Sequence, residues 1–177
     1  KKEGFIRGLS GVKIVDLPGI YSLAPYTDEE TVTRNFLIKE RPDAIINVVD
    51  ATNIERNLYL TLQILELNIP TVIALNMMDE VRIHGTVIKL PLLEQALSCP
   101  VVPIVASKGQ GFDDLVSRTV SQAQAKANRK PLDFCEGPTH KAIHSVTHIV
   151  EDYAKQLSYP PRFAAVSLIE GEEGLEK

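Results

Sequence analysis

The stretch "VKIVDLPGIYSL", residues 12–23, sets the first expectations for this chain. A β-branched run stops at Asp16 and is followed by Pro18 and Gly19, which is typical of a buried strand that leads into a turn. Asp16 then has two interpretations. It is either the polar residue that ends the strand, or a carboxylate that holds Mg²⁺ while Gly19 offers an unobstructed backbone N–H to a phosphate.

Four apolar runs of this kind alternate with helix-like stretches and predict a parallel sheet covered on both faces. The runs are "VKIVD" (12–16), "AIINVVD" (44–50), "PTVIALN" (70–76) and "VVPIV" (101–105). In front of them, a turn at Leu9-Ser10 between Gly8 and Gly11 predicts an antiparallel hairpin. We therefore expect a mixed, mostly parallel α/β sheet.

Two pairs of residues have the spacing of a helix-starting capping box. They are Thr27 with Glu30, and Thr52 with Glu55. Both pairs stand before a stretch with helical periodicity, so each predicts where a helix begins.

The segment "NRKPLDFCEGP", residues 128–138, interrupts the helical pattern with two prolines and a glycine. A helix is expected before it, and after it a second helix to about Leu157 and a shorter one to about Ile169. We therefore predict a first domain over residues 1–130 and the beginning of a helical domain over 131–177.

Composition excludes several classes of protein. With a net charge of -4 and no block of basic residues, the chain lacks the positive surface needed to wrap nucleic acid or bind anionic lipid. Its two cysteines, Cys99 and Cys135, suggest neither a disulfide framework nor a zinc site, which fits a reducing cytoplasm. The longest apolar run is about half of the roughly 20 residues that span a bilayer, and no signal peptide opens the chain, so we expect a soluble segment.

Two further strand ends carry candidate binding residues. After the strand at 70–76, Asp79 can accept hydrogen bonds from the N1–H and the amino group of guanine, whereas adenine offers a lone pair there. The alternative is that Asn76 or Asp79 merely caps the next helix. After the strand at 101–105, the "VASKGQG" loop can bring the Ala106 N–H to the guanine carbonyl oxygen, although alone this loop is a weak signal.

Ligands bind at the carboxyl ends of parallel strands, so three such motifs in sequence favour a nucleotide site. Asp16 is also the candidate Mg²⁺ ligand. The candidate binding residues are Asp16, Leu17, Pro18, Gly19, Asn76, Met77, Met78, Asp79, Val105, Ala106 and Ser107.

The chain resembles the intracellular GTP-binding domain of FeoB-type ferrous iron transporters, which have a Ras-like P-loop NTPase fold. The residues that carry the resemblance are "DLPGIYSLAPYTDEE" (16–30), "NVVDATNIERNLYLTLQILE" (47–66), "ALNMMDE" (74–80) and "PLDFCEGPTHKAIH" (131–144). The resemblance implies that Asp16–Gly19 senses the γ-phosphate and Mg²⁺, that Asn76–Asp79 reads guanine, and that Val105–Ser107 completes the base loop. It implies that residues from about 131 begin a helical spacer toward a membrane domain.

The sequence departs from the pattern of the wider GTPase class, and two of these departures bear directly on phosphate binding and hydrolysis. It contains no Gly-Lys-Ser or Gly-Lys-Thr, so the phosphate-binding loop and the first strand are expected upstream of Lys1. Ile20 stands where many GTPases have a water-orienting glutamine, and no catalytic residue can be named. By itself the chain is expected to bind GTP weakly and to be inactive, whereas its full-length parent would be a GTPase.

The resemblance implies a regulatory domain that binds GTP or GDP with Mg²⁺ and gates Fe(II) uptake from the cytoplasmic face of a prokaryotic inner membrane. Its expected partner is the permease domain of the same protein, with a homo-oligomer left open. The alternatives are a soluble ribosome- or RNA-associated GTPase and a non-catalytic interaction module. His140, His144 and His148 follow one another at helical spacing; we expect a solvated row, with metal binding as the alternative.

Overall fold

A computed structural model of the protein describes residues 2–6, 8–125 and 136–171. Its elements alternate as expected for an α/β fold. In chain order they are β1 (Lys2–Phe5), β2 (Lys13–Asp16), α1 (Asp28–Glu40), β3 (Ile45–Asp50), the 3-10 turn η1 (Ala51–Asn53), α2 (Ile54–Glu66), β4 (Thr71–Asn76), α3 (Met78–Ile83), α4 (Leu90–Leu97), β5 (Val101–Pro103), the 3-10 turn η2 (Ala106–Lys108), α5 (Phe112–Ala125), α6 (Gly137–Gln156) and α7 (Pro161–Ile169).

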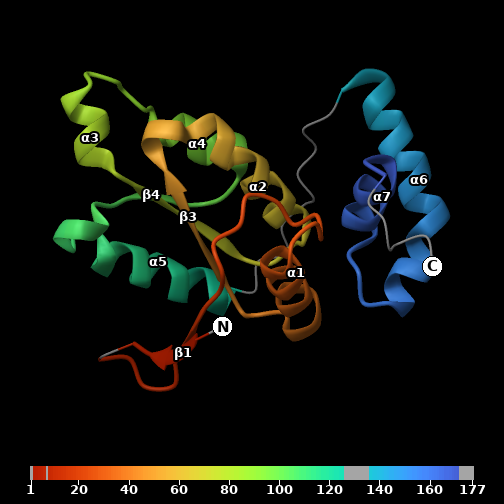
Figure 1. The fold of residues 1–177 in the computed structure, drawn as a ribbon, viewed down its shortest axis with the longest axis horizontal. Helices are drawn as coiled ribbons and strands as arrows, with labels where there is room; N and C mark the ends of the chain where they lie inside the picture. The colour runs from red at the N-terminus through yellow and green to blue at the C-terminus, as the bar shows by residue number, and fades with distance from the viewer. Residues whose placement is uncertain (1, 7, 126–135, 172–177) are drawn as a thin grey trace.

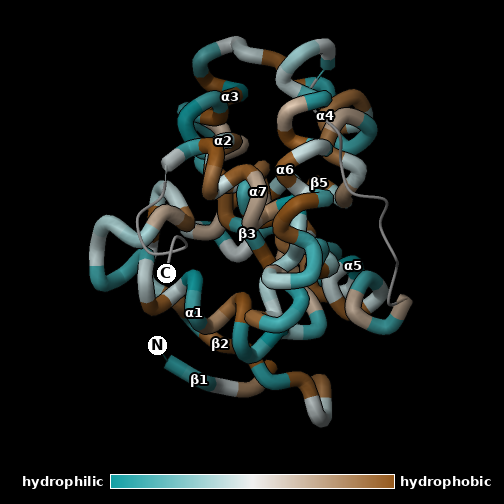
Figure 2. Tube along the Cα trace, turned by 90° about the vertical axis from the view of Figure 1, so that its right-hand side faces the viewer, coloured by the Kyte–Doolittle hydropathy of each residue, from teal (hydrophilic) through white to brown (hydrophobic). Residues whose placement is uncertain are grey.

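The centre of the fold is a three-stranded parallel sheet in the order β3-β4-β5. Side chains alternate across β4, so Val72 and Ala74 pack with Leu115 of α5, whereas Ile73 and Leu75 pack with residues of α2, α3 and α4. Every residue from Thr71 to Leu75 is buried, as the continuous apolar run predicts for a strand covered on both faces. Figure 2 shows the hydrophobic segments gathered around β3 and β5 in the interior.

The predicted hairpin is present, but it forms a sheet of its own. β1 and β2 pair antiparallel, with Lys2 opposite Asp16 and Phe5 opposite Lys13. In the described part of the chain this pair is not hydrogen-bonded to the β3-β4-β5 sheet, and Figure 1 shows β1 at one end of the molecule. The expected mixed sheet is therefore seen as two sheets, with β3 at the edge of the parallel one.

Of the two predicted capping boxes, one is confirmed and one is wrong. The Glu30 N–H donates to Thr27 Oγ1 at 3.2 Å and the Thr27 N–H donates to Glu30 Oε2 at 3.0 Å, so α1 begins as expected. Thr52 instead lies inside η1, where its N–H and Oγ1 both donate to Asp50 Oδ1, at 2.8 and 2.7 Å. Asp50, the last residue of β3, takes the capping role because its carboxylate accepts both of these hydrogen bonds.

The helices expected after the first domain are α6 and α7, which pack against each other beside the α/β unit. Ile143 and Ala154 are buried in the contact face of α6. Tyr153 and Leu157, which are also large apolar residues near the end of this helix, are 71% and 64% exposed. Eleven residues make about three helical turns, so Ile143 and Ala154 lie on the same side of α6. Tyr153 precedes Ala154 by one residue and therefore lies about 100° around the helix from it.

The predicted domain boundary near residue 131 lies outside the described residues, and so does Cys135. Cys99 is buried in the hydrophobic cluster that also contains Leu97 of α4. Within residues 2–6, 8–125 and 136–171, none of the helices combines the length and the apolar character that crossing a membrane requires.

Candidate nucleotide-binding site

The loops that follow β4 and β5 lie together at the carboxyl end of the parallel sheet. The Ala106 N–H donates to Asn76 Oδ1 at 3.0 Å, which joins the two loops directly. Asn76, the last residue of β4, therefore also orders the loop after β5. Because this N–H is already paired, it would have to be shared with a guanine carbonyl oxygen for the predicted contact to form.

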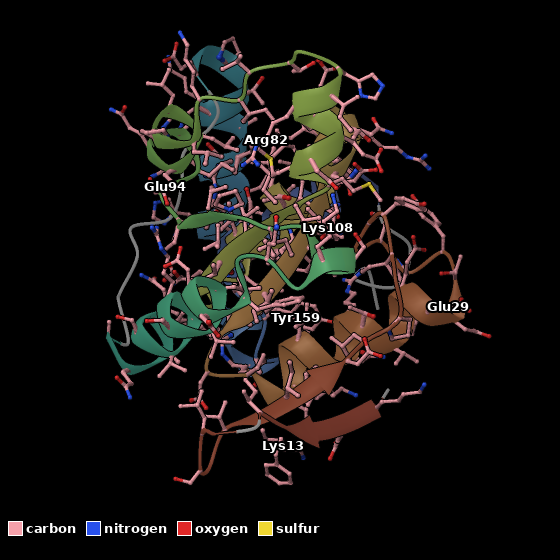
Figure 3. All side chains as sticks on the ribbon, turned by 90° about the vertical axis from the view of Figure 1, so that its left-hand side faces the viewer. Lys13, Glu29, Arg82, Glu94, Lys108 and Tyr159 are labelled. Atoms are coloured by element: carbon pink, nitrogen blue, oxygen red, sulfur yellow. The ribbon has the colours of Figure 1, made fainter. Side chains whose placement is uncertain are left out.

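Asp79 lies in the first turn of α3 and is paired with a residue that the sequence did not single out. Lys108 Nζ donates to Asp79 Oδ2 at 2.6 Å, and the Asp79 side chain keeps 27% of its surface exposed. The hydrogen bond from the Lys108 ammonium lowers the pKa of the Asp79 carboxyl, and the backbone N–H groups of Asp79 and Glu80 also lower it. Asp79 is thus an ionised acceptor at neutral pH. In Figure 3, Lys108 lies beside the end of α3.

The loop from Val105 to Gly111 is held by its own backbone. The Val105 N–H donates to the Gln110 carbonyl at 3.1 Å, and the Gln110 N–H donates to the Val105 carbonyl at 3.2 Å. Val105 itself is buried in the core beside Val101, so its side chain anchors the loop and does not face a ligand. Ala106 and Ser107 are exposed, and they are the part of the predicted segment that a base could contact.

The two methionines between Asn76 and Asp79 have different roles. Met77 adopts a left-handed conformation with φ of 63° and is 37% exposed, so its side chain is available to cover an apolar surface. Met78 is 8% exposed and belongs to the hydrophobic core. The expectation that Met78 belongs to the binding surface therefore does not hold for its side chain, because the first turn of α3 points it toward Val81 and Leu97.

Asp16 and Gly19 lie at the end of the hairpin, where the sequence placed a phosphate sensor. Asp16 is the last residue of β2 and is exposed, and Gly19 is exposed in the loop that follows. Leu17 and Ile20 pack against the core cluster that contains Leu23 and Phe163. Gly19, with the half-buried Pro18 before it, thus forms the exposed tip of a loop whose two flanking side chains are anchored.

A magnesium ion fits this position chemically. Mg²⁺ is commonly bound through one or two carboxylates together with phosphate oxygens and water, and Asp16 supplies one exposed carboxylate. Among the described residues, no three or more histidine, cysteine, aspartate or glutamate side chains are grouped to hold a metal. The ring centres of His140 and His144 lie 6.0 Å apart and those of His144 and His148 lie 4.6 Å apart, so neighbouring rings in the row on α6 contact each other at tilted and edge-to-face angles.

The segment after Gly19 is tied to two residues that the sequence gave no reason to select. The Leu23 N–H donates to Gln63 Oε1 at 2.7 Å, and Ser22 Oγ donates to the same oxygen at 3.2 Å. Arg34 Nη1 donates to the Leu23 carbonyl at 3.5 Å. Gln63 and Arg34 come from α2 and α1, so only the packing of both helices reveals these contacts.

Gly19→Ala is expected to leave the fold intact while impairing contact with a terminal phosphate. A Cβ added at Gly19 meets no atom within 4 Å and the backbone is not left-handed, so the free energy of unfolding should change by less than about 1 kcal/mol. Thermal unfolding of the variant tests the first half, and GTP affinity relative to GDP in the full-length protein tests the second. A large loss of stability would contradict the argument that glycine is not needed here for folding.

The known proteins that this chain is similar to are ferrous iron transport proteins. The family model described as "Ferrous iron transport protein B" matches residues 1–119. An Fe(2+) transport protein A/Fe(2+) transporter FeoB fusion protein of Porphyromonas gingivalis is 40% identical over 181 residues, which cover 99% of this chain and 21% of that protein. The Fe(2+) transporter FeoB of Escherichia coli K12 is 44% identical over 120 residues, which cover 65% of this chain and 16% of that protein.

Solved structures agree over almost the whole chain. A mutant of S. thermophilus NFeoB bound to mGDP superposes with a TM-score of 0.91 at 37% identity, covering 98% of this chain and 66% of that one. The cytosolic domain of the T. maritima FeoB iron transporter in its GMPPNP form superposes with a TM-score of 0.85 at 33% identity, covering 99% and 70%. The chain thus spans about a fifth of the curated relatives it matches.

Proposed function

Since this chain belongs to the family of ferrous iron transport protein B and is a GTP-binding domain of the FeoB type, we propose that its parent couples GTP binding and hydrolysis to Fe(II) uptake. The uptake would take place across a prokaryotic cytoplasmic membrane. The domain would lie on the cytoplasmic face, next to the permease domain of the same protein. The state of the nucleotide would act through the segment Gly19–Asp28, which follows the phosphate sensor and precedes α1.

The observation that carries the proposal is the junction of the loops after β4 and β5. Asn76 holds the Ala106 N–H, and Asp79 presents an ionised carboxylate beside that loop. In our proposal Asp79 accepts hydrogen bonds from the N1–H and amino group of guanine, while the exposed Met77 side chain covers the base. Adenine lacks these donors and would leave the carboxylate unpaired.

On the phosphate side, Asp16 would hold Mg²⁺ and the Gly19 N–H would contact the γ-phosphate. The remaining phosphate contacts would come from a strand and a phosphate-binding loop upstream of Lys1. Two features support this placement: β3 is the edge strand of the parallel sheet as described, and Val48 in its middle is 59% exposed. An additional strand beside β3 would cover Val48 and deliver its loop to the carboxyl ends of the strands.

Hydrolysis would not use the residue after Gly19. Ile20 is partly buried against the cluster that contains Leu23 and Phe163, and a hydrocarbon side chain has no group that orients water. Backbone groups or residues outside this chain would have to position the nucleophile, with Mg²⁺ supplying charge stabilisation to the phosphates when bound. Slow turnover is the consequence.

The proposal is tested by measuring GDP and ADP binding to the full-length protein and to its Asp79→Ala variant. We expect the wild type to prefer GDP strongly, and the variant to lose about tenfold or more in GDP affinity because charge-assisted hydrogen bonds to the base are removed. Glu151→Ala is a matched control, since Glu151 is an exposed carboxylate that pairs with a lysine at the same 2.6 Å but lies on α6.

Two outcomes would overturn the assignment. Equal affinity for GDP and ADP would show that Asp79 does not read guanine, and so would unchanged GDP affinity in Asp79→Ala. Binding of neither nucleotide by the full-length protein would favour an interaction module instead. The acidic net charge of -4 argues against the ribosome- or RNA-associated alternative.

A further inference from the structure

Lys108 makes the same contact with Asp79 that a guanine base would make. Its Nζ lies 2.6 Å from Asp79 Oδ2, and the two side chains are 57% and 27% exposed. A guanine that reads Asp79 through both of its donors needs both carboxylate oxygens in a favourable direction. Lys108 therefore occupies part of the acceptor surface that the proposed function assigns to the base.

The backbone of Lys108 is held in place, whereas its side chain is free to move. The Lys108 N–H donates to the Val105 carbonyl at 3.0 Å, and the Gly109 N–H donates to the Ala106 carbonyl at 3.2 Å. Among the described residues, however, the ammonium of Lys108 pairs with Asp79 alone, and more than half of the side chain is exposed. The ammonium can therefore leave the carboxylate without a change in the fold of the loop.

We infer that Lys108 is a displaceable latch on the guanine-reading carboxylate, which closes the base site in the absence of nucleotide and must swing away when guanine enters. The inference rests on the proposed function, because it requires Asp79 to read the base. The lysine ammonium and the guanine base are two hydrogen-bond donors that compete for the carboxylate of Asp79.

The ion pair between Lys108 and Asp79 is weak enough for a nucleotide to displace it. An ion pair between exposed side chains contributes little net free energy, because water solvates both charges and the lysine loses conformational freedom. Such a pair can be displaced by a base that offers two hydrogen bonds. Removing it should tighten guanine nucleotide binding by about two- to fivefold, which is the range expected for an exposed pair.

Lys108→Met tests the latch in the full-length protein, with GDP as the ligand. Methionine keeps much of the apolar stem and removes the charge. Loss of a positive charge alone would weaken the binding of an anionic nucleotide, so tighter binding has the opposite sign and identifies the latch. Lys155→Met is the matched control: Lys155 also pairs with a carboxylate at 2.6 Å on the surface, but on α6, and this variant should bind GDP like the wild type.

Ionic strength supplies a second measurement that a purely structural role would not move. Salt screens exposed charges, so the ratio of wild-type to Lys108→Met dissociation constants should fall toward one between about 50 mM and about 500 mM salt. The weakening of phosphate contacts by salt affects both proteins and cancels in this ratio.

Unchanged or weaker GDP binding by Lys108→Met would overturn the latch. If Asp79→Ala still lost GDP affinity in the same experiment, the guanine site would stand and only the latch would be wrong. If Asp79→Ala had no effect and GDP and ADP bound alike, the proposed function would be wrong, and the latch with it.

Discussion

Replacing Gly111 by alanine is expected to lower the free energy of unfolding by about 3 kcal/mol, because the position combines a left-handed backbone with a direct steric conflict. Gly111 has φ of 84°, and an added Cβ would lie 2.5 Å from the Pro103 carbonyl oxygen and 2.9 Å from Ile104 Cγ2. Pro103 is the last residue of β5, and Ile104 follows it. To make room, the loop after β5 would have to move away from the sheet.

The effect is measured by thermal or denaturant unfolding of the whole chain, with Gly109→Ala as the matched variant. Gly109 also has a positive φ, 65°, but an added Cβ there meets nothing within 4 Å. Gly109→Ala should therefore cost only the backbone strain, about 1 kcal/mol. Equal losses in the two variants would show that contact with Pro103 and Ile104 is not what makes glycine necessary at position 111.

Arg34→Ala is expected to destabilise the protein by about 3 kcal/mol and to loosen α7, because Arg34 joins three parts of the fold. It is 5% exposed. Its guanidinium carbon lies 5.7 Å from the ring centre of Tyr159 and 5.4 Å from that of Phe163, and Nη1 donates to the Leu23 carbonyl. Alanine would leave a cavity against both rings and would remove one hydrogen bond from a buried carbonyl.

Denaturant unfolding measures the loss, and amide hydrogen exchange shows where the protein opens. We expect faster exchange in α7 and in the segment around Leu23, with the parallel sheet unaffected. Arg118→Ala serves as the control, because Arg118 pairs with Glu94 and Asp114 on the surface and should cost less than about 1 kcal/mol. A loss from Arg34→Ala as small as that of the control would contradict a structural role for the buried guanidinium.

The residues of the candidate site could be selected from the sequence because they lie at or just after the ends of strands, and a strand is recognised from the apolar residues next to one another in the chain. Asn76 ends an apolar run, and burial on both faces makes such a run recognisable without an alignment. Asp16 ends a shorter β-branched run, although β2 is largely exposed and not the buried strand that the sequence predicted. The parallel pairing of β4 and β5 then places the ends of both strands at one edge of the sheet. The meeting of Asn76 with Ala106, thirty residues apart, follows from that pairing.

The partners of these residues could not be predicted, because they come from distant parts of the chain. Lys108 lies 29 residues after Asp79, and Gln63 lies 40 residues after Leu23. A lysine in a loop and a glutamine in a helix are ordinary surface residues in a sequence. Only the packing of the loop on α3, and of α2 on the segment after Gly19, gives them a specific role.

What the sequence determined by itself is the alternation of strands and helices, the cap of α1 at Thr27, and the placement of Asp16, Asn76 and Asp79 at or just after the ends of strands. These depend on the chemistry of neighbouring residues, such as apolar runs and capping pairs. The tertiary structure alone decided that the hairpin stands apart from the parallel sheet and that Met78 turns into the core. It also decided that "DLPG" has anchored flanks and that Lys108 covers Asp79, because each depends on contacts between segments that are far apart in the chain.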